Sequence, residues 1–148
     1  MMKTTQQPVY KDPARPIEDR VQDLLAQMTL DEKIAQLGSA WVFELLDGLA
    51  FSEQKAARVM GHGIGQVTRI GGASNLRPAD SARLANTIQR WLVEHTRLGI
   101  PAMVHEECCS GYMALSATCF PQAIGVASTW NPALVEQMTA AIRAQMRP

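Results

Sequence analysis

"GIGQVTRI" at residues 63–70 and "IPAMVHE" at residues 100–106 are two short apolar segments, each of the length expected for a buried strand. Glycines bound the first segment, and the second lacks a clean alternation of apolar and polar residues, which is typical of a strand covered on both faces. Between them, residues 78–99 place apolar side chains three or four positions apart and predict a helix of about five turns. This order of strand, helix and strand predicts an α/β fold with a parallel sheet.

The segments before this unit predict an arm and two helices. Residues 1–15 are polar and contain two prolines, so we expect an extended arm that lies on the surface or is loose. The folded part begins with residues 16–28, whose apolar side chains recur at helical spacing. Thr29 followed by Glu32 forms a capping box that opens a second, short helix. Residues 41–60 are apolar and then charged, and we expect a helix and a loop there without defined boundaries.

The segments after this unit predict one more strand and one more helix. "IGVAST" at residues 124–129 is expected to be a third strand. Asn131 and Pro132 then provide a helix cap and a first-turn proline, and apolar residues continue at helical spacing as far as Met146. The pattern of alternating strands and helices therefore continues toward the end of the chain.

Composition excludes several classes of function. The 148 residues contain 14 basic and 14 acidic side chains, so no broad positive field is available to bind nucleic acid. The N-terminus lacks the apolar region of a signal peptide, and no segment has the roughly 20 apolar residues that cross a bilayer. Three cysteines, Cys108, Cys109 and Cys119, are an odd count without a disulfide framework. We therefore expect a cytoplasmic protein with reduced thiols and no membrane contact.

The chemistry-bearing residues cluster in "HEECCSG", residues 105–111, directly after the second apolar segment. In parallel α/β folds, functional groups gather at the carboxyl ends of the strands. The alternative is that these side chains make local hydrogen bonds and that the cysteines pack in the interior. A zinc, redox or thiol-nucleophile site of His105 with the cysteines is a further alternative, but the C-x-x-C spacing is missing. We assign no metal ligand.

Several longer stretches, taken together, carry a family resemblance. They are "YKDPARPIEDRVQDLLAQMTLDEKIAQL", "GIGQVTR", "ANTIQRWLVEHTRLGIPAMVHEECCSGYMA" and "ATCFPQAIGVASTWNPALV". In this order they resemble the N-terminal part of glycoside hydrolase family 3, the β-glucosidase and β-xylosidase group. The resemblance extends from about Tyr10 to Arg147 and covers nearly the whole chain.

The resemblance implies a (β/α)8 TIM-type barrel, which takes about 250 residues, so residues 16–148 would be only its N-terminal portion. It implies a retaining β-glycosidase of carbohydrate metabolism that acts on β-linked glucosides or xylosides and needs no cofactor. In the family, the nucleophile and the acid/base lie beyond this stretch, so we assign no catalytic residue and expect the isolated chain to be inactive. The alternative function is a non-catalytic carbohydrate-binding or regulatory fragment.

The resemblance also implies one substrate-binding residue. Glu107 lies four positions before Gly111, as does the acidic residue in family patterns similar to "HEECLHG" that binds sugar hydroxyls in the −1 subsite. Cys109 and Ser110 replace the leucine and histidine of that pattern. Arg69, at the end of the first predicted strand, is expected either to face Glu107 across the barrel mouth or to cap a surface.

The neighbouring polar and aromatic residues are assigned other roles. We expect Glu106 and His105 to be structural or supporting residues. Glu106 would point away from Glu107, because successive side chains on a strand point to opposite faces. We expect Tyr112, Trp41 and Trp130 to belong to the core or an interface rather than to stack against a sugar.

Overall fold

The fold is seen in a computed structural model that describes residues 7–147. Its centre is a three-stranded parallel sheet in the order β1–β4–β5. These strands are Ser39–Trp41, Gln66–Thr68 and Met103–His105. The predicted α/β class and parallel sheet are confirmed, although β1 was not predicted and each strand is only three residues long.

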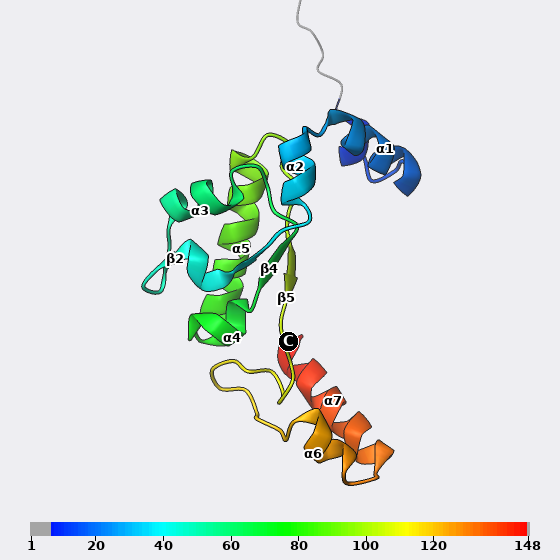
Figure 1. Cartoon of the computed structure of the whole chain (residues 1–148), viewed down its shortest axis with the longest axis vertical. Helices are drawn as coiled ribbons and strands as arrows, with labels where there is room; N and C mark the ends of the chain where they lie inside the picture. The colour runs from blue at the N-terminus through cyan, green and yellow to red at the C-terminus, as the bar shows by residue number, and fades with distance from the viewer. Residues whose placement is uncertain (1–6, 148) are drawn as a thin grey trace, which may run out of the picture.

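Helices and one small hairpin surround this sheet. The helical elements are η1 (Val9–Lys11), α1 (Ile17–Gln27), α2 (Leu30–Ala35), η2 (Val42–Leu45), α3 (Glu53–Met60), α4 (Ile70–Ser74), α5 (Pro78–His95), α6 (Ala123–Ala127) and α7 (Pro132–Met146). The hairpin pairs β2 (Leu46–Asp47) with β3 (Ala50–Phe51) in antiparallel fashion. Figure 1 shows α5 running alongside β4 and β5, with α6 and α7 at the far end of the chain.

Local sequence signals explain the helix starts. Thr29 Oγ1 accepts a hydrogen bond from Glu32 N at 3.3 Å, and Thr29 N donates to Glu32 Oε2 at 2.8 Å, so the predicted capping box is confirmed. Pro78 occupies the first turn of α5, where no backbone N–H is needed. Asn131 caps α7 by accepting a hydrogen bond from Leu134 N at 3.1 Å.

The hydrophobic core lies on one face of the sheet. Ala40 of β1 and Val67 of β4 are buried there, packed in one cluster with Ile88 and Leu92 of α5. The positions before them on each strand point to the opposite face and are exposed, and Met103 of β5 is 67% exposed. The expectation that the strand in residues 100–106 is covered on both faces is therefore wrong, because Met103 and Val104, which point to opposite faces of β5, are 67% and 39% exposed.

The prediction of a third strand at residues 124–129 is also wrong. Within residues 124–129 the chain forms the end of helix α6, followed by a turn in which Ser128 Oγ donates to Gly125 O at 2.7 Å. This apolar segment is short, and in the described residues no neighbouring strand pairs with it. Without a strand partner its backbone groups are satisfied locally, so the helix is formed instead.

The N-terminal segment is tied to the fold by polar contacts. The predicted arm is described from residue 7, while residues 1–6 lie outside the described part. It contains the 3₁₀ turn η1 rather than being extended throughout, and Tyr10 Oη donates to Leu98 O at 2.7 Å. Arg97 also binds Glu32 through Nε, at 2.8 Å from Oε1, and through Nη2.

Across the described residues, no helix has the length and apolar character needed to cross a membrane.

Candidate functional site at the carboxyl ends of the strands

The three parallel strands end at the same edge of the sheet. Their last residues, Trp41, Thr68 and His105, are register partners. The ladder continues one step further, because Arg69 N donates to His105 O at 2.8 Å. Residues that follow these strands are therefore brought together although they lie far apart in the sequence.

Arg69 is held in an unusual conformation at this edge. Its backbone is left-handed, with φ 61° and ψ 44°, which is uncommon for a residue with a side chain and is enriched at functional sites. Its Nη1 lies 3.2 Å from Glu107 Oε2, and its guanidinium lies over the Trp41 ring at 5.3 Å from the ring centroid. Of the two expectations for Arg69, the structure places it facing Glu107.

Glu107 presents a partly free carboxylate. Its side chain is 56% exposed, and Oε2 accepts the hydrogen bond from Arg69. Within residues 7–147, Oε1 accepts no hydrogen bond. An ionised carboxylate in this arrangement retains acceptor capacity for hydroxyl groups of a ligand.

Glu106 has a different task from its neighbour. Its Oε1 accepts a hydrogen bond from Gly71 N at 2.6 Å, and its Oε2 accepts one from Gly72 N at 3.2 Å. The carboxylate thereby satisfies two backbone donors at the start of α4 and links that helix to the end of β5. The argument from opposite faces of a strand does not apply, since β5 ends at His105. The two glutamates differ because they have different hydrogen-bond partners.

A cavity of about 360 Å³ lies beside Glu106, between α5, the end of β5 and Tyr112. His105 and Ser81 line it, and within the described residues His105 Nε2 and Ser81 Oγ are buried without a hydrogen-bond partner. The other ring nitrogen, His105 Nδ1, lies 3.5 Å from Thr68 Oγ1. Burial, followed by the charge of the Glu106 carboxylate, raises the pKa of Tyr112. Tyr112 is half-buried and lines the same cavity.

The cysteines form no disulfide with one another. Cys108 Sγ lies 3.5 Å from Met146 Sδ. Burial, then the Glu106 carboxylate and Cys109, raises the pKa of the Cys108 thiol, whereas a nucleophile or metal ligand requires the thiolate. Among residues 7–147, no group of three His, Cys, Asp or Glu side chains is arranged to hold a metal ion.

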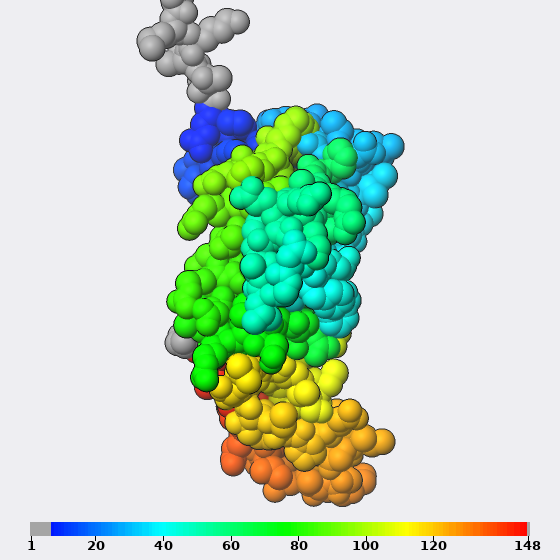
Figure 2. Space-filling model, turned by 90° about the vertical axis from the view of Figure 1, so that its left-hand side faces the viewer, coloured from blue at the N-terminus to red at the C-terminus, as the bar shows by residue number. Residues whose placement is uncertain are grey.

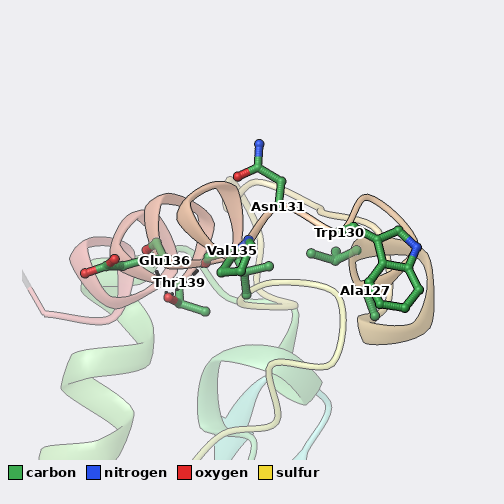
Figure 3. Close-up of a pocket in the computed structure, with 8 residues that line it drawn as sticks. Ala127, Trp130, Asn131, Val135, Glu136 and Thr139 are labelled. Carbon is green, nitrogen blue, oxygen red and sulfur yellow. Dashed lines mark hydrogen bonds between the residues drawn. The ribbon is translucent and has the colours of Figure 1, made fainter.

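A larger hollow, of about 570 Å³, lies between the end of α6 and the start of α7. Figure 3 shows Ala127 and Trp130 at one side of it and Glu136 and Thr139 at the other. Its lining is mostly apolar, and Trp130 is 92% exposed, so of the two places predicted for Trp130 the core is excluded and an interface stays a prediction. None of the residues predicted to bind substrate lines this hollow.

Sequence reasoning missed Trp41 as a member of the site, and it expected Glu106 to be a structural or supporting residue without giving its partners. Trp41 was expected in the core or an interface, yet it is 39% exposed and contacts Arg69. Trp41 ends strand β1, and recognising that strand would have placed it at the site. With only three residues, β1 shows no periodic pattern in the sequence. The cap that Glu106 supplies to α4 had no local signal either, because its partners are 35 and 34 residues away.

Residues 29–148 match the model of the glycosyl hydrolase family 3 N-terminal domain. The chain belongs to this family. The resemblance found in the sequence is thereby confirmed, and two named relatives agree with it. The chain is 33% identical over 164 residues to the probable β-glucosidase C of Aspergillus oryzae, covering 95% of this chain and 25% of the relative. It is 30% identical over 138 residues to a putative β-xylosidase of Formosa agariphila, covering 90% of this chain and 18% of the relative.

A solved structure supports the same relationship. A β-glucosidase from Erythrobacter marinus superposes with a TM-score of 0.67 at 33% sequence identity, covering 87% of this chain and 17% of that chain. This family 3 chain therefore shares its α/β arrangement with a glucosidase, and it spans about a quarter or less of the length of the relatives it matches.

Proposed function

We propose that residues 16–148 form the N-terminal portion of the (β/α)8 barrel of a retaining β-glycosidase, preceded by an arm at residues 1–15. The substrate is a β-linked glucoside or xyloside, and the reaction is hydrolysis of its O-glycosidic bond. The observation that carries this proposal is the Arg69–Glu107 ion pair at the carboxyl edge of the parallel sheet in a family 3 chain. This is the edge at which barrel enzymes bind their substrates.

The half-covered sheet supports the barrel portion of the proposal. Ala40 of β1 and Val67 of β4 pack with α5 on one face of the sheet, as in the outer layer of a barrel, while Ser39, Gln66 and Met103 on the other face are exposed. The outer edges of β1 and β5 have no strand partner within residues 7–147. In a closed barrel both edges are paired and the inner face is filled by side chains.

Glu107 is proposed to bind the sugar. Its Oε1 and the remaining acceptor capacity of Oε2 suit two neighbouring hydroxyls, because ionised carboxylates accept strong hydrogen bonds. Arg69 fixes the orientation of the carboxylate from the sheet side at 3.2 Å. Together they form a charged wall of the sugar subsite.

The catalytic carboxyl groups are proposed to lie outside residues 1–148. A retaining glycosidase needs a nucleophile and an acid/base about 5–5.5 Å apart. Glu106 is the other carboxylate next to Glu107, but both of its oxygens accept hydrogen bonds from backbone N–H groups of α4. It is therefore not available as the acid/base, and the chain alone should not hydrolyse a glycoside.

The proposal is tested by Glu107→Gln in the full-length enzyme, assayed with 4-nitrophenyl β-D-glucoside and β-D-xyloside. The substitution removes a charge and an acceptor, so kcat/KM should fall by about ten- to a hundredfold. The matched control is Glu106→Gln, which should change kcat/KM by about threefold or less while lowering stability. Equal, small effects on kcat/KM from both variants would reject Glu107 as the sugar ligand.

A second experiment tests the position of the catalytic groups. The purified 148-residue chain should show no hydrolysis of either nitrophenyl glycoside above that of a buffer blank. Turnover that copurifies with the chain through several columns would place a catalytic pair within it.

We also propose a cytoplasmic location, supported by three cysteines that form no disulfide with one another.

A further inference from the structure

We propose that Trp41 is a positioning residue for the Glu107 carboxylate and that it acts through Arg69. This inference rests on the proposed function, since it concerns the same sugar subsite. It adds a residue from a third strand, because Trp41 ends β1 whereas Arg69 follows β4 and Glu107 follows β5.

The first observation is the weak fixation of Arg69 by hydrogen bonds. Its side chain is 22% exposed, its Nη1 donates to Glu107, and its Nε is buried without a partner within residues 7–147. One hydrogen bond does not fix the plane of a guanidinium, which carries five N–H donors in a rigid fork. Another contact is needed to hold this group toward Glu107.

The Trp41 ring supplies that contact. The guanidinium carbon of Arg69 lies 5.3 Å from the ring centroid, within the range of a cation–π interaction. Tryptophan gives the strongest interaction of this kind among the aromatic side chains, and the planar guanidinium also stacks well on its face. The ring therefore restricts Arg69 to orientations in which Nη1 reaches Glu107.

Trp41 is itself held in place by the fold. Its backbone pairs in register with Thr68, and its backbone N–H donates to Glu44 Oε1 at 2.8 Å. Its ring stacks on Phe43 at a centroid distance of 5.5 Å. Both Arg69 and Phe43 pack on the ring face. This arrangement suits a support for Arg69 better than an open platform for a sugar ring.

The left-handed backbone of Arg69 fits the same scheme. Residues on a regular strand alternate between faces, and the turn after Thr68 redirects the Arg69 side chain. Such a conformation is uncommon for a non-glycine residue and persists only where surrounding contacts hold it. Trp41 at the end of β1 and Glu107 in the segment after β5 contact the guanidinium and supply contacts of that kind.

The kinetic test compares Trp41→Leu, Trp41→Phe and Arg69→Met in the full-length enzyme. Trp41→Leu should lower kcat/KM about tenfold, and Trp41→Phe, which keeps an aromatic face, should retain it within about threefold. Because Trp41 acts through Arg69, the double variant Trp41→Leu/Arg69→Met should be no worse than Arg69→Met alone. Losses that multiply, or a Trp41→Leu variant with wild-type kcat/KM, would overturn the proposal.

A spectroscopic readout separates this inference from the proposed function. In ¹⁵N NMR spectra of the full-length enzyme, the Trp41 ring current should displace the Arg69 Nε–H signal, and Trp41→Phe should reduce this displacement while leaving the signals of residues that do not contact Trp41 in place. An Arg69 signal that is unchanged in Trp41→Phe would reject the positioning role. Absence of hydrolysis by the wild-type full-length enzyme would instead reject the proposed function, and the NMR result would still decide whether Trp41 holds Arg69.

Discussion

Helices α5 and α7 begin with the same local signal but end in different surroundings. Each has a proline in its first turn and apolar residues at helical spacing. Helix α5 buries five side chains, among them Ile88 and Leu92, whereas α7 buries only Ile142 among its described residues. In Figure 2 the orange segment with α6 and α7 lies at one end of the elongated molecule. The comparison teaches that local signals form a helix, while tertiary partners decide how much it contributes to stability.

The largest expected effect tests this difference directly. Ile88 is fully buried in the core, so Ile88→Ala should lower the free energy of unfolding by about 3 kcal/mol. Ile142 is buried but already lines a cavity of about 370 Å³, so Ile142→Ala should cost less, about 2 kcal/mol, at the low end for this substitution. Urea unfolding followed by circular dichroism measures both values. Equal costs would show that α7 is packed as firmly as α5.

A smaller effect is expected where α4 meets the segment that follows β5. A Cβ added at Gly71 would lie 1.9 Å from Tyr112 Oη, so Gly71→Ala should cost about 2 kcal/mol through overpacking. Tyr112→Leu in the same chain should recover about half of this loss, which a double-mutant cycle would measure. A Gly71→Ala cost below about 0.5 kcal/mol would mean that the segment with Tyr112 moves away from α4 without penalty.

The N-terminal helices provide a third kind of region, fixed by charge instead of core packing. Arg97 and the Thr29 groups hold the pKa of Glu32 at about 2, against an ordinary value of 4.5. Because the folded-state pKa is lowered, the stabilisation is present above about pH 4.5 and is lost as the pH falls toward 2. Glu32→Gln should cost about 1.5 kcal/mol at pH 7 and remove this pH dependence, whereas exposed Glu18→Gln should change neither. Thermal unfolding of the three proteins between pH 2 and pH 7 measures this. The same pH dependence in the wild type and in Glu32→Gln would contradict the role of Glu32.

The smallest effect concerns the reactivity of the three thiols, Cys108, Cys109 and Cys119. Cys109 and Cys119 are exposed, whereas Cys108 is half-buried and has a raised pKa. At pH 8, Cys108 should therefore react with iodoacetamide about threefold or more slowly than the other two, since the thiolate is the reactive form. Peptide mass spectrometry after timed labelling measures the three rates. Fastest labelling at Cys108 would contradict the burial seen beside Met146.

Some parts of the site were predictable from sequence for a clear reason. Glu107 and Arg69 each follow an apolar strand segment, and parallel strands bring their carboxyl ends together. Glu106 and Trp41 were assigned incompletely. The partners of Glu106 are more than 30 residues away, and Trp41 belongs to a strand without a periodic pattern of its own.

The sequence by itself determined the helices α1, α2, α5 and α7, the caps of α2 and α7, and the family, because these depend on side-chain spacing, on hydrogen bonds between near neighbours and on motifs in a fixed order. Only the tertiary structure decided which face of the sheet is covered, that residues 124–129 join a helix, and that the two adjacent glutamates have separate tasks. The physical reason is that strand pairing, burial and the hydrogen bonds of Glu106 and Glu107 depend on groups distant in the chain. The spacing of residues within a short segment does not predict such partners.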